Sequence, residues 1–166
     1  NAVAVATSNK YNQPNVRMVL LKGLSDKGFV FYTNFNSRKG SELKDNQKAS
    51  MCFHWKSLLR QIRIIGKVSL VSNQTADEYY SSRGYDSRIG AWASNQSQEL
   101  KKRDQLLKSI KDYKKKFSDE KNVPRPSHWS GWNLSPDSIE FWLDGDNRIH
   151  ERLKYVKKSF NKWSKS

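Results

Sequence analysis

The sequence holds few of the residues and motifs on which several classes of site depend. Its 166 residues include a single cysteine, Cys52, which excludes an internal disulfide framework and a zinc cluster built from cysteines. The three histidines are scattered without an H-E-x-x-H motif, so we expect no metal site. The G-x-G-x-x-G, P-loop and G-x-S-x-G motifs are also absent, which leaves dinucleotide binding, NTP binding and acyl-transfer hydrolysis without support.

Long apolar stretches are absent as well. No run approaches the roughly 20 residues that cross a bilayer, and no basic segment followed by an apolar one marks a secretory signal. Together with the low cysteine content, this indicates a protein of the reducing cytoplasm with no membrane partner. The aromatic content of 12%, with six tryptophans, indicates a folded core rather than disorder.

Positive charge is abundant and unevenly distributed. The chain has 31 lysines and arginines against 16 aspartates and glutamates, a net charge of +15. Residues 101–121 hold nine basic and four acidic residues, and residues 148–166 hold seven basic and one acidic. An apolar stripe in the first segment predicts a helix with its lysines in solvent. We therefore expect no specific nucleic-acid partner, although a basic nucleic-acid-binding module stays open as an alternative.

The order of apolar and turn segments predicts a mainly β protein. Strands are predicted at 2–7, 16–22, 29–33, 49–55, 61–71, 138–143 and 148–156. Helices are predicted at 37–46 with Ser37 as N-cap, at 75–82 with Thr75 as N-cap, and at 97–117, with a loop at 84–94. The short connections between strands favour antiparallel pairing and a small barrel with peripheral helices over a doubly wound sheet. We expect one domain over residues 1–166, with a helical excursion at about 74–117.

Two segments combine cations with residues that suit an anion. Ser37-Arg38-Lys39-Gly40 stands at a predicted helix start, where outward N–H groups and the helix dipole favour a phosphate. The segment R-G-Y-D-S (83–87) offers a guanidinium, hydroxyl donors and a flexible glycine. Taken alone, each segment is better explained as a solvated surface turn.

Other features are ambiguous when taken one at a time. Lys22 ends a predicted strand, and its side chain lies either at a barrel rim or in a site. If residues 148–152 form a strand, Arg148, His150 and Arg152 share one face, which suits either an electron-rich ligand or an exposed edge strand. The side chains that could bind a flat heterocycle are those of Trp142, Gln61, Gln96 and Ser97.

Six segments, in order along nearly the whole chain, together resemble one family. They are R-M-V-L-L-K (17–22), F-Y-T-N-x-x-S-R-K-G (31–40), R-Q-I-R-I-x-G (60–66), S-R-x-x-D-S-x-I-G-A-W-A-S-x-Q-S (82–97), V-P-R-P-x-x-W (123–129) and I-E-F-W-x-x-x-x-x-R-I-H-x-R (139–152). This set is similar to that of the pyridoxamine/pyridoxine 5′-phosphate oxidases.

The resemblance implies a single FMN-binding split β-barrel domain that forms a homodimer with FMN at the subunit interface. It implies oxidation of pyridoxine 5′-phosphate or pyridoxamine 5′-phosphate to pyridoxal 5′-phosphate, a step of vitamin B6 metabolism. In that reaction a hydride passes to flavin N5, and O2 reoxidises the flavin to give H2O2.

The resemblance also implies roles for individual residues. The residues implied to contact FMN are Arg17, Met18, Val19, Leu20, Leu21, Lys22, Tyr32, Thr33, Arg38, Lys39, Gln61, Gln96, Ser97, Trp142 and Arg152. The residues implied to hold the substrate phosphate are Lys22, Tyr79, Arg83 and Ser87. Arg148 and His150 are implied to lie at the substrate ring and are the catalytic candidates, with His150 able to accept a proton and both able to clamp the ring.

The chain departs from the family pattern at several positions. Gly84 stands where the family has the proline of S-R-P, Ile149 replaces a leucine, and Ser130 replaces a glycine. The family's terminal R-L-x-P does not follow Trp163. Gly84 and this terminus leave open an alternative function, a non-catalytic binder of flavin or pyridoxal phosphate with the same fold.

Overall fold

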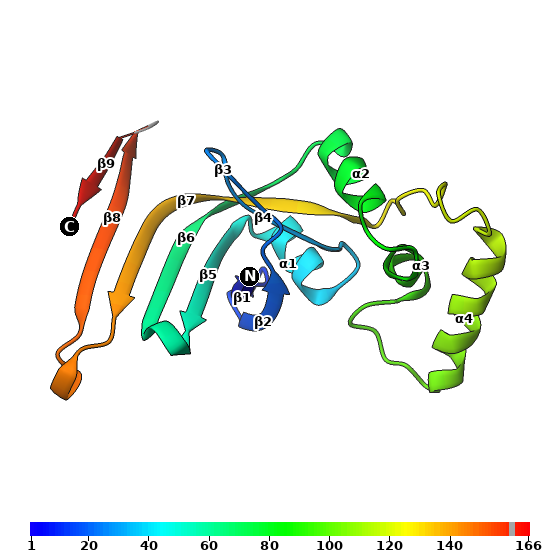
Figure 1. Ribbon diagram of the computed structural model, residues 1–166, viewed down its shortest axis with the longest axis horizontal. Helices are drawn as coiled ribbons and strands as arrows, with labels where there is room; N and C mark the ends of the chain where they lie inside the picture. The colour runs from blue at the N-terminus through cyan, green and yellow to red at the C-terminus, as the bar shows by residue number, and fades with distance from the viewer. Residues whose placement is uncertain (160–161) are drawn as a thin grey trace. The chain divides into compact units, whose positions relative to one another are not determined.

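The computed structural model describes residues 1–159 and 162–166 of the chain (Figure 1). The strands of the described residues are β1 (Ala2–Ser8), β2 (Pro14–Leu20), β3 (Gly23–Ser25), β4 (Gly28–Asn34), β5 (Lys48–Trp55), β6 (Arg60–Leu70), β7 (Trp129–Leu143), β8 (Glu151–Ser159) and β9 (Lys162–Lys165). The helices are α1 (Arg38–Asp45), α2 (Asn73–Ser81), α3 (Tyr85–Ala93) and α4 (Arg103–Lys116), with short 3-10 turns η1 (Lys56–Leu58) and η2 (Asp146–Arg148).

The strands form one sheet in the order β2-β1-β5-β6-β7-β4-β3, and β8 and β9 continue from β7. Pairing is antiparallel from β2 through β1 and β5 to β6, in the hairpin of β3 with β4, and from β7 through β8 to β9. The register places Ala4 opposite Met18 on one side and opposite Cys52 on the other. The predicted antiparallel, mainly β architecture with peripheral helices is therefore confirmed.

The chain divides into two compact units. Unit 1 comprises residues 1–31, 42–69 and 132–166, and unit 2 comprises residues 32–41 and 70–131. Unit 1 holds most of the sheet, and unit 2 holds α2, α3 and α4 (Figure 1). The single domain over residues 1–166 stays a prediction.

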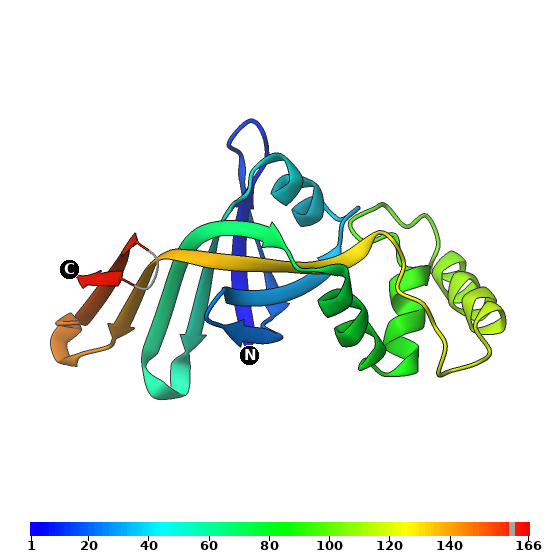
Figure 2. The ribbon, with the colours of Figure 1, turned by 90° about the horizontal axis from the view of Figure 1, so that it is seen from above.

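The core of unit 1 follows from alternation along its strands. In β1, Val3, Val5 and Thr7 are buried while the residues between them are partly exposed, which is the period of two expected for a strand with one buried face. Phe31 and Ile64 are fully buried in the same unit. β6 bends along its length, as Figure 2 shows from above.

Unit 2 has a separate aromatic core. Tyr80 of α2, Ile89 of α3, Val123 and Trp129 are buried together, and partly buried side chains of α4, including Tyr113, pack against them. α4 itself buries none of its residues fully. α2 and α3 are therefore anchored by fully buried residues, whereas α4 is attached through half-buried ones.

α4 is attached to α3 by contacts of the Trp92 ring with Tyr113 and Phe117 and by polar contacts. Lys114 lies 2.7 Å from an oxygen of Asp86, and the Tyr85 hydroxyl donates to the carbonyl oxygens of Phe117, at 3.0 Å, and Lys114, at 3.4 Å. Because the Lys114 and Asp86 side chains are exposed, solvent weakens their ion pair.

Three helical predictions need correction. Residues 84–94, predicted as a loop, contain α3, because Arg88, Ile89 and Ala93 are buried by tertiary packing that periodicity did not reveal. The helix predicted at 97–117 begins only at Arg103, since Ser97 has a positive φ of 67°. The N-cap of α2 is Ser72, whose hydroxyl accepts from the Thr75 amide at 3.1 Å, rather than Thr75 itself.

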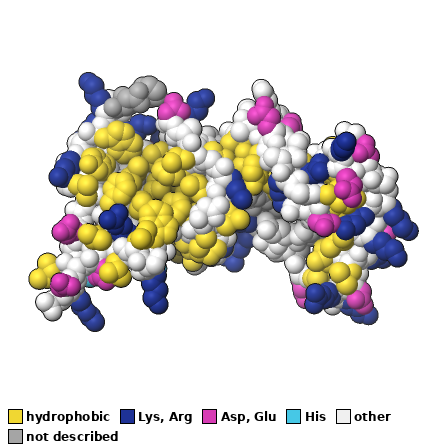
Figure 3. All heavy atoms as spheres, viewed as in Figure 1, with side chains coloured by type: hydrophobic (Ala, Val, Ile, Leu, Met, Phe, Trp, Pro, Cys, Tyr) yellow, Lys and Arg dark blue, Asp and Glu magenta, His cyan; other side chains and the backbone are white. Residues whose placement is uncertain are grey.

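Several large apolar side chains of unit 1 are exposed. They include Val16, Met18 and Leu20, which alternate along one face of β2, and Ile65, Phe141 and Trp163. Figure 3 shows apolar side chains gathered over β5, β6 and β7 on the face turned to the viewer. An apolar face of this kind marks an interaction surface. Among the described residues, no helix is both long and apolar enough to cross a bilayer.

Candidate active site

The start of α1 is a tight turn closed by a serine. The buried Ser37 hydroxyl donates to the Asn34 carbonyl oxygen at 2.6 Å and accepts from the Gly40 amide at 3.3 Å. Ser37 is therefore the N-cap of α1, as predicted, an interaction that contributes about 1 kcal/mol. A side chain at position 40 would clash with this turn, because a Cβ there would lie 2.6 Å from the carbonyl oxygens of Asn34 and Phe35.

A buried lysine links this turn to the segment that follows α3. Lys39 is only 8% exposed, and its ammonium donates to the Ser37 hydroxyl at 3.2 Å and to Oε1 of Gln96 at 3.1 Å. The Thr33 hydroxyl donates to the same Gln96 oxygen at 3.4 Å. Three residues implied to contact FMN, Thr33, Lys39 and Gln96, therefore meet in unit 2. Arg38 stands at the first position of α1, where the helix N-terminus favours an anion.

An aromatic stack lies beside Arg83 in the same unit. The rings of Tyr32 and Tyr79 are stacked with centroids 3.9 Å apart, and the Trp129 ring lies 5.2 Å from that of Tyr32 and nearly parallel to it. The Arg83 guanidinium carbon lies 4.8 Å from the Trp129 ring centroid and 5.8 Å from that of Tyr80. The structure thus brings Tyr32, predicted at FMN, together with Tyr79 and Arg83, predicted at the substrate phosphate.

The guanidinium of Arg83 has an unsatisfied donor. Its Nη1 is buried and has no hydrogen-bond partner among the described residues. Burial lowers the pKa of Arg83, an effect that Tyr79 and Tyr80 partly oppose. A buried, unpaired N–H is costly, and an anion accepting from it would remove that cost.

The other residue implied at the substrate phosphate in this unit, Ser87, is exposed in the first turn of α3. Its backbone amide donates to the Gly84 carbonyl oxygen at 3.0 Å. Gly84 is the residue before the helix, and a Cβ there would meet nothing within 4 Å. Ser97 is exposed in a turn after Gln96.

The residues implied on β2 and just after it lie in unit 1. Arg17 is held internally, because one of its nitrogens lies 3.1 Å from a carboxylate oxygen of the buried Glu42 and another donates to the Thr7 hydroxyl. The remaining implied residues are Met18 and Leu20, which are exposed, Val19 and Leu21, which are half-buried, and Lys22, which is exposed. The amide of Lys22 donates to the Val30 carbonyl oxygen at 2.8 Å, which fixes its backbone against β4.

A carboxylate joins two arginines of unit 1. One oxygen of Glu140 on β7 accepts from Arg63 of β6 at 3.2 Å and from Arg152 of β8 at 3.1 Å. Arg152, implied at FMN, is also the register partner of Trp142 on β7. Gln61 is half-buried on β6 opposite His54 of β5.

The connection between β7 and β8 corrects one prediction. β8 begins at Glu151, so Arg148 and His150 do not share a strand face with Arg152. Arg148 ends η2 with a positive φ of 64°, a backbone that a strand does not allow.

His150 is nevertheless placed against two residues of unit 1. Its Nδ1 lies 2.8 Å from an oxygen of Asp144, and its ring centroid lies 4.7 Å from that of Trp142. The Gly145 amide also lies 3.4 Å from Nδ1, but the closer carboxylate oxygen at 2.8 Å favours the tautomer with the proton on Nδ1, which leaves Nε2 as a proton acceptor.

Three residues in these contacts were not found from the sequence. They are Trp129, whose ring lies under the Arg83 guanidinium, and the two acids Glu42 and Glu140, which pair with implied FMN residues. Trp129 stands in the motif at 123–129, so its position was marked but its role was not. Glu140 likewise stands in the motif at 139–152 without a role, and Glu42 carries no local signal, because Arg17 is 25 positions away.

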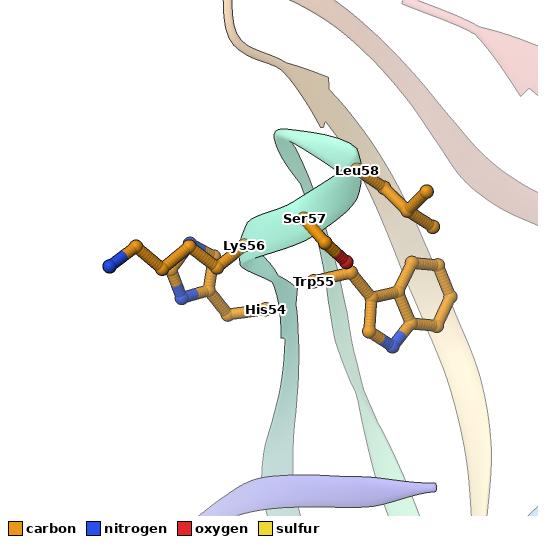
Figure 4. Close-up of a pocket in the computed structure, with 5 residues that line it drawn as sticks. All are labelled: His54, Trp55, Lys56, Ser57 and Leu58. Atoms are coloured by element: carbon orange, nitrogen blue, oxygen red, sulfur yellow. The ribbon is translucent and has the colours of Figure 1, made fainter.

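A concavity outside these groups lies at the tip of the β5–β6 hairpin. It has a volume of about 840 Å³ and is lined by His54, Trp55, Lys56, Ser57 and Leu58. Figure 4 shows His54 and Lys56 on one side of η1 and Trp55 and Leu58 on the other. It contains none of the implied residues. Within the part of the chain that the structure describes, no cluster of three or more His, Cys, Asp or Glu side chains could hold a metal ion.

Comparison with known proteins gives the family. Residues 1–117 match the family model described as pyridoxamine 5′-phosphate oxidase, and residues 129–166 match the pyridoxine 5′-phosphate oxidase C-terminal dimerisation region. The chain belongs to the pyridoxine/pyridoxamine 5′-phosphate oxidase family. This is a family of FMN-dependent oxidoreductases, so the predicted FMN cofactor is confirmed.

Individual relatives agree with this assignment. The pyridoxine/pyridoxamine 5′-phosphate oxidase of Pelagibacter ubique (strain HTCC1062) is 68% identical over 166 residues, which cover 100% of this chain and 80% of that protein. The enzyme of the same name from Agrobacterium fabrum (strain C58 / ATCC 33970) is 53% identical, with 99% of this chain and 80% of that protein covered.

Solved structures confirm the split β-barrel fold of the family. The structure of PhzG from Burkholderia lata 383, in complex with tetrahydrophenazine-1-carboxylic acid, has a TM-score of 0.91 and 29% identity, and it covers 99% of this chain and 80% of that one. A pyridoxamine 5′-phosphate oxidase-related, FMN binding protein from Nostoc punctiforme PCC 73102 shares the fold, with a TM-score of 0.78, 15% identity and coverage of 99% and 86%. The match of residues 129–166 to a dimerisation region supports a homodimer.

Proposed function

We propose that this chain, as a homodimer with FMN at the subunit interface, oxidises pyridoxine 5′-phosphate or pyridoxamine 5′-phosphate to pyridoxal 5′-phosphate. The observation that carries the proposal is the buried, unpaired Nη1 of Arg83, at a position that the family motif implies for the substrate phosphate. The name of the 68% identical relative supports the same substrates. A cytoplasmic location is an expectation from the low cysteine content.

The residues at the start of α1 fit the phosphate of FMN. The Ser37 turn presents the first amides of α1 and the buried Lys39 ammonium, and Arg38 adds a second cation beside them. Amides at a helix N-terminus and two cations suit a phosphate monoester, which carries a charge near −1.5 to −2. Thr33 and Gln96, already hydrogen-bonded beside Lys39, would extend the polar surface.

Bound FMN would supply the redox chemistry, in which a hydride leaves C4′ of the substrate for flavin N5 and O2 is reduced to H2O2. The chain's own residues bind and orient the substrate. Arg83 would hold the phosphate through its free N–H, with Lys22, Tyr79 and Ser87 as further donors. The distance and angle of the hydride transfer would depend on how these residues anchor the substrate phosphate.

His150 would take the proton that leaves the substrate's oxygen or nitrogen. The carboxylate of Asp144 lies at Nδ1, which leaves Nε2 as the accepting atom. The exposed Arg148 would lie against the substrate ring. The exposed apolar stripe of β2, together with the match to a dimerisation region, supports a second copy covering part of unit 1.

A spectrum and a peroxide assay test the proposal. The purified protein should show the visible absorption of a flavin and, with pyridoxine 5′-phosphate under air, should produce H2O2 and pyridoxal 5′-phosphate in equal amounts. A colourless protein that does not take up added FMN would refute the proposal. Flavin without substrate-dependent peroxide would favour the non-catalytic binder instead.

Substitution of Arg83 tests the substrate role separately from FMN. Arg83→Ala should raise KM for the phosphorylated substrate while leaving the flavin content unchanged, because Arg83 is assigned to the substrate only. The exposed Arg103 at the start of α4 provides a control, since Arg103→Ala removes the same charge at a position with no implied role. Loss of flavin in Arg83→Ala would contradict the assignment.

A further inference from the structure

We propose that Trp129 is a positioning residue that fixes the Arg83 guanidinium and the Tyr79 ring for the substrate phosphate. The inference rests on the proposed function and goes beyond it, because neither the family motif nor the comparisons give Trp129 a role. It concerns residues of unit 2 alone.

The first support is the stacking geometry. The Trp129 ring is within 11° of parallel to Tyr32 and within 8° of parallel to Tyr79, whose centroid lies 6.1 Å away. The Arg83 guanidinium carbon lies 4.8 Å from the same indole, inside the range of a cation–π contact. One side chain therefore contacts both Arg83 and the tyrosine stack.

The second support is the donor that this contact leaves available. A guanidinium packed on a ring by its face keeps its N–H groups in its own plane, where they can meet an anion. Nη1 of Arg83 is buried and has no partner among the described residues. The cation–π contact with Trp129 thus restricts the position of the guanidinium without occupying this donor.

The third support is the anchoring of Trp129 itself. Its carbonyl oxygen accepts from Arg125 at 2.8 Å, and Nε of Arg125 lies 2.6 Å from a carboxylate oxygen of Asp77 on α2. α2 also carries Tyr79. The indole is only 7% exposed and meets Tyr80 edge-on, so its orientation is fixed by packing. The scaffold that holds Trp129 is therefore the helix that presents Tyr79.

A plain core role for Trp129 makes a different prediction. Loss of a core ring lowers stability, whether or not Arg83 is present. A positioning role makes the effect on phosphate binding depend on Arg83, and a double-mutant cycle measures that dependence. The variants are Trp129→Phe, Trp129→Leu, Arg83→Met and the Trp129→Leu/Arg83→Met pair.

The control is Trp92→Phe. Trp92 belongs to the same unit, its ring makes tilted contacts with those of Tyr113 and Phe117, and it donates to the Pro124 carbonyl oxygen at 2.8 Å. It has no assigned role in the site. Trp92→Phe therefore measures how replacing an indole by a smaller ring in unit 2, away from Arg83, changes KM and the phosphate Kd.

Two binding readouts are used with purified holoenzyme. The first is the split of KM and kcat for pyridoxine 5′-phosphate, and the second is the Kd of inorganic phosphate by calorimetry, which needs no turnover. Flavin content and thermal midpoint are recorded for each variant. Trp129→Leu should raise KM and the phosphate Kd by about 5- to 30-fold, the effect of losing a desolvated cation–π contact. kcat and flavin content should change little, because the interaction holds ground state and transition state alike.

The double-mutant cycle distinguishes a positioning role of Trp129 from a core role. In the Arg83→Met background, Trp129→Leu should raise KM and Kd by less than about twofold, and Trp129→Phe should recover part of the wild-type affinity. Effects that multiply in the double variant would overturn the inference, as would a wild-type phosphate Kd in Trp129→Leu. If the wild type fails to oxidise pyridoxine 5′-phosphate but the phosphate Kd still shows the coupling, the proposed function fails while the role of Trp129 stands.

Discussion

Adding one methyl group at Gly40 should destabilise the protein and weaken its hold on FMN. A Cβ at this position would lie 2.6 Å from two carbonyl oxygens, those of Asn34 and Phe35. Real Cβ contacts are essentially never closer than 3.0 Å, so the turn that carries Ser37 must move by several tenths of an ångström. These oxygens belong to the backbone, so no side-chain rotation relieves the clash.

The magnitude follows from two opposing effects. Overpacking against a fixed backbone costs about 3 kcal/mol, at the upper end of the usual range. Replacing glycine by alanine inside a helix regains about 1 kcal/mol. Gly40→Ala should therefore lower the free energy of unfolding by about 2 kcal/mol. For a chain of this length, that corresponds to a fall of roughly 4–8 °C in the thermal midpoint.

Gly90→Ala is the matched control. Gly90 lies inside α3, and a Cβ there would meet nothing within 4 Å, so only the helix-propensity gain applies. This variant should raise the free energy of unfolding by about 0.5–1 kcal/mol. Urea unfolding of both variants with a common m-value gives the two energies, and equilibrium dialysis gives the Kd for FMN. A Gly40→Ala variant as stable as the wild type, or two variants that change in the same direction, would refute the steric reasoning.

Three further changes test other contacts. Gly84→Pro should raise the free energy of unfolding by about 0.4–1 kcal/mol, because its φ of −56° already suits proline and a Cβ there meets open space; a lower thermal midpoint would contradict this. Burial raises the pKa of Tyr80 to about 12 from 10.0, so the folded state retains the proton and stability should fall as pH rises from about 10 to about 12. Tyr80→Phe should make stability depend less on pH between about 10 and about 12. At neutral pH it should lower the free energy of unfolding by about 1 kcal/mol, because the hydrogen bond to the Arg88 carbonyl oxygen is lost. An alkaline unfolding curve identical to that of the wild type would contradict this. Glu42→Gln should lower the free energy of unfolding at neutral pH by about 2 kcal/mol, since it leaves Arg17 without its buried carboxylate, and adding Arg17→Met should recover part of the loss in the same urea titration.

β1 and α1 could be predicted because their information is local, whereas β7 begins at Trp129 and not at the predicted residue 138. Val3 and Val5 alternate with small residues in β1, and Ser37 combines a capping hydroxyl with a following glycine at the third helical position. Such patterns depend on neighbours within a few residues, and they placed β1 and α1 within one or two residues of their observed bounds.

The missed features depend on partners that are distant in the sequence. α3 contains a glycine and lacks an apolar stripe, and its burial comes from contacts such as those of Arg88 with the carbonyl oxygen of Glu120. The left-handed backbone of Arg148, which ends the predicted strand face, has no sequence signal of its own. The contact of Trp129 with Arg83 joins residues 46 positions apart, so the motif marked both residues without showing that they meet.

The loose attachment of α4 has a consequence for proteolysis. This helix buries no residue fully, and residues 101–121 offer nine lysines and arginines, which are the cleavage sites of trypsin. Segments with few buried contacts open most often, so a protease should reach this one before the sheet. A first cut here would separate most of the residues that match the oxidase model, 1–117, from the dimerisation region that starts at 129.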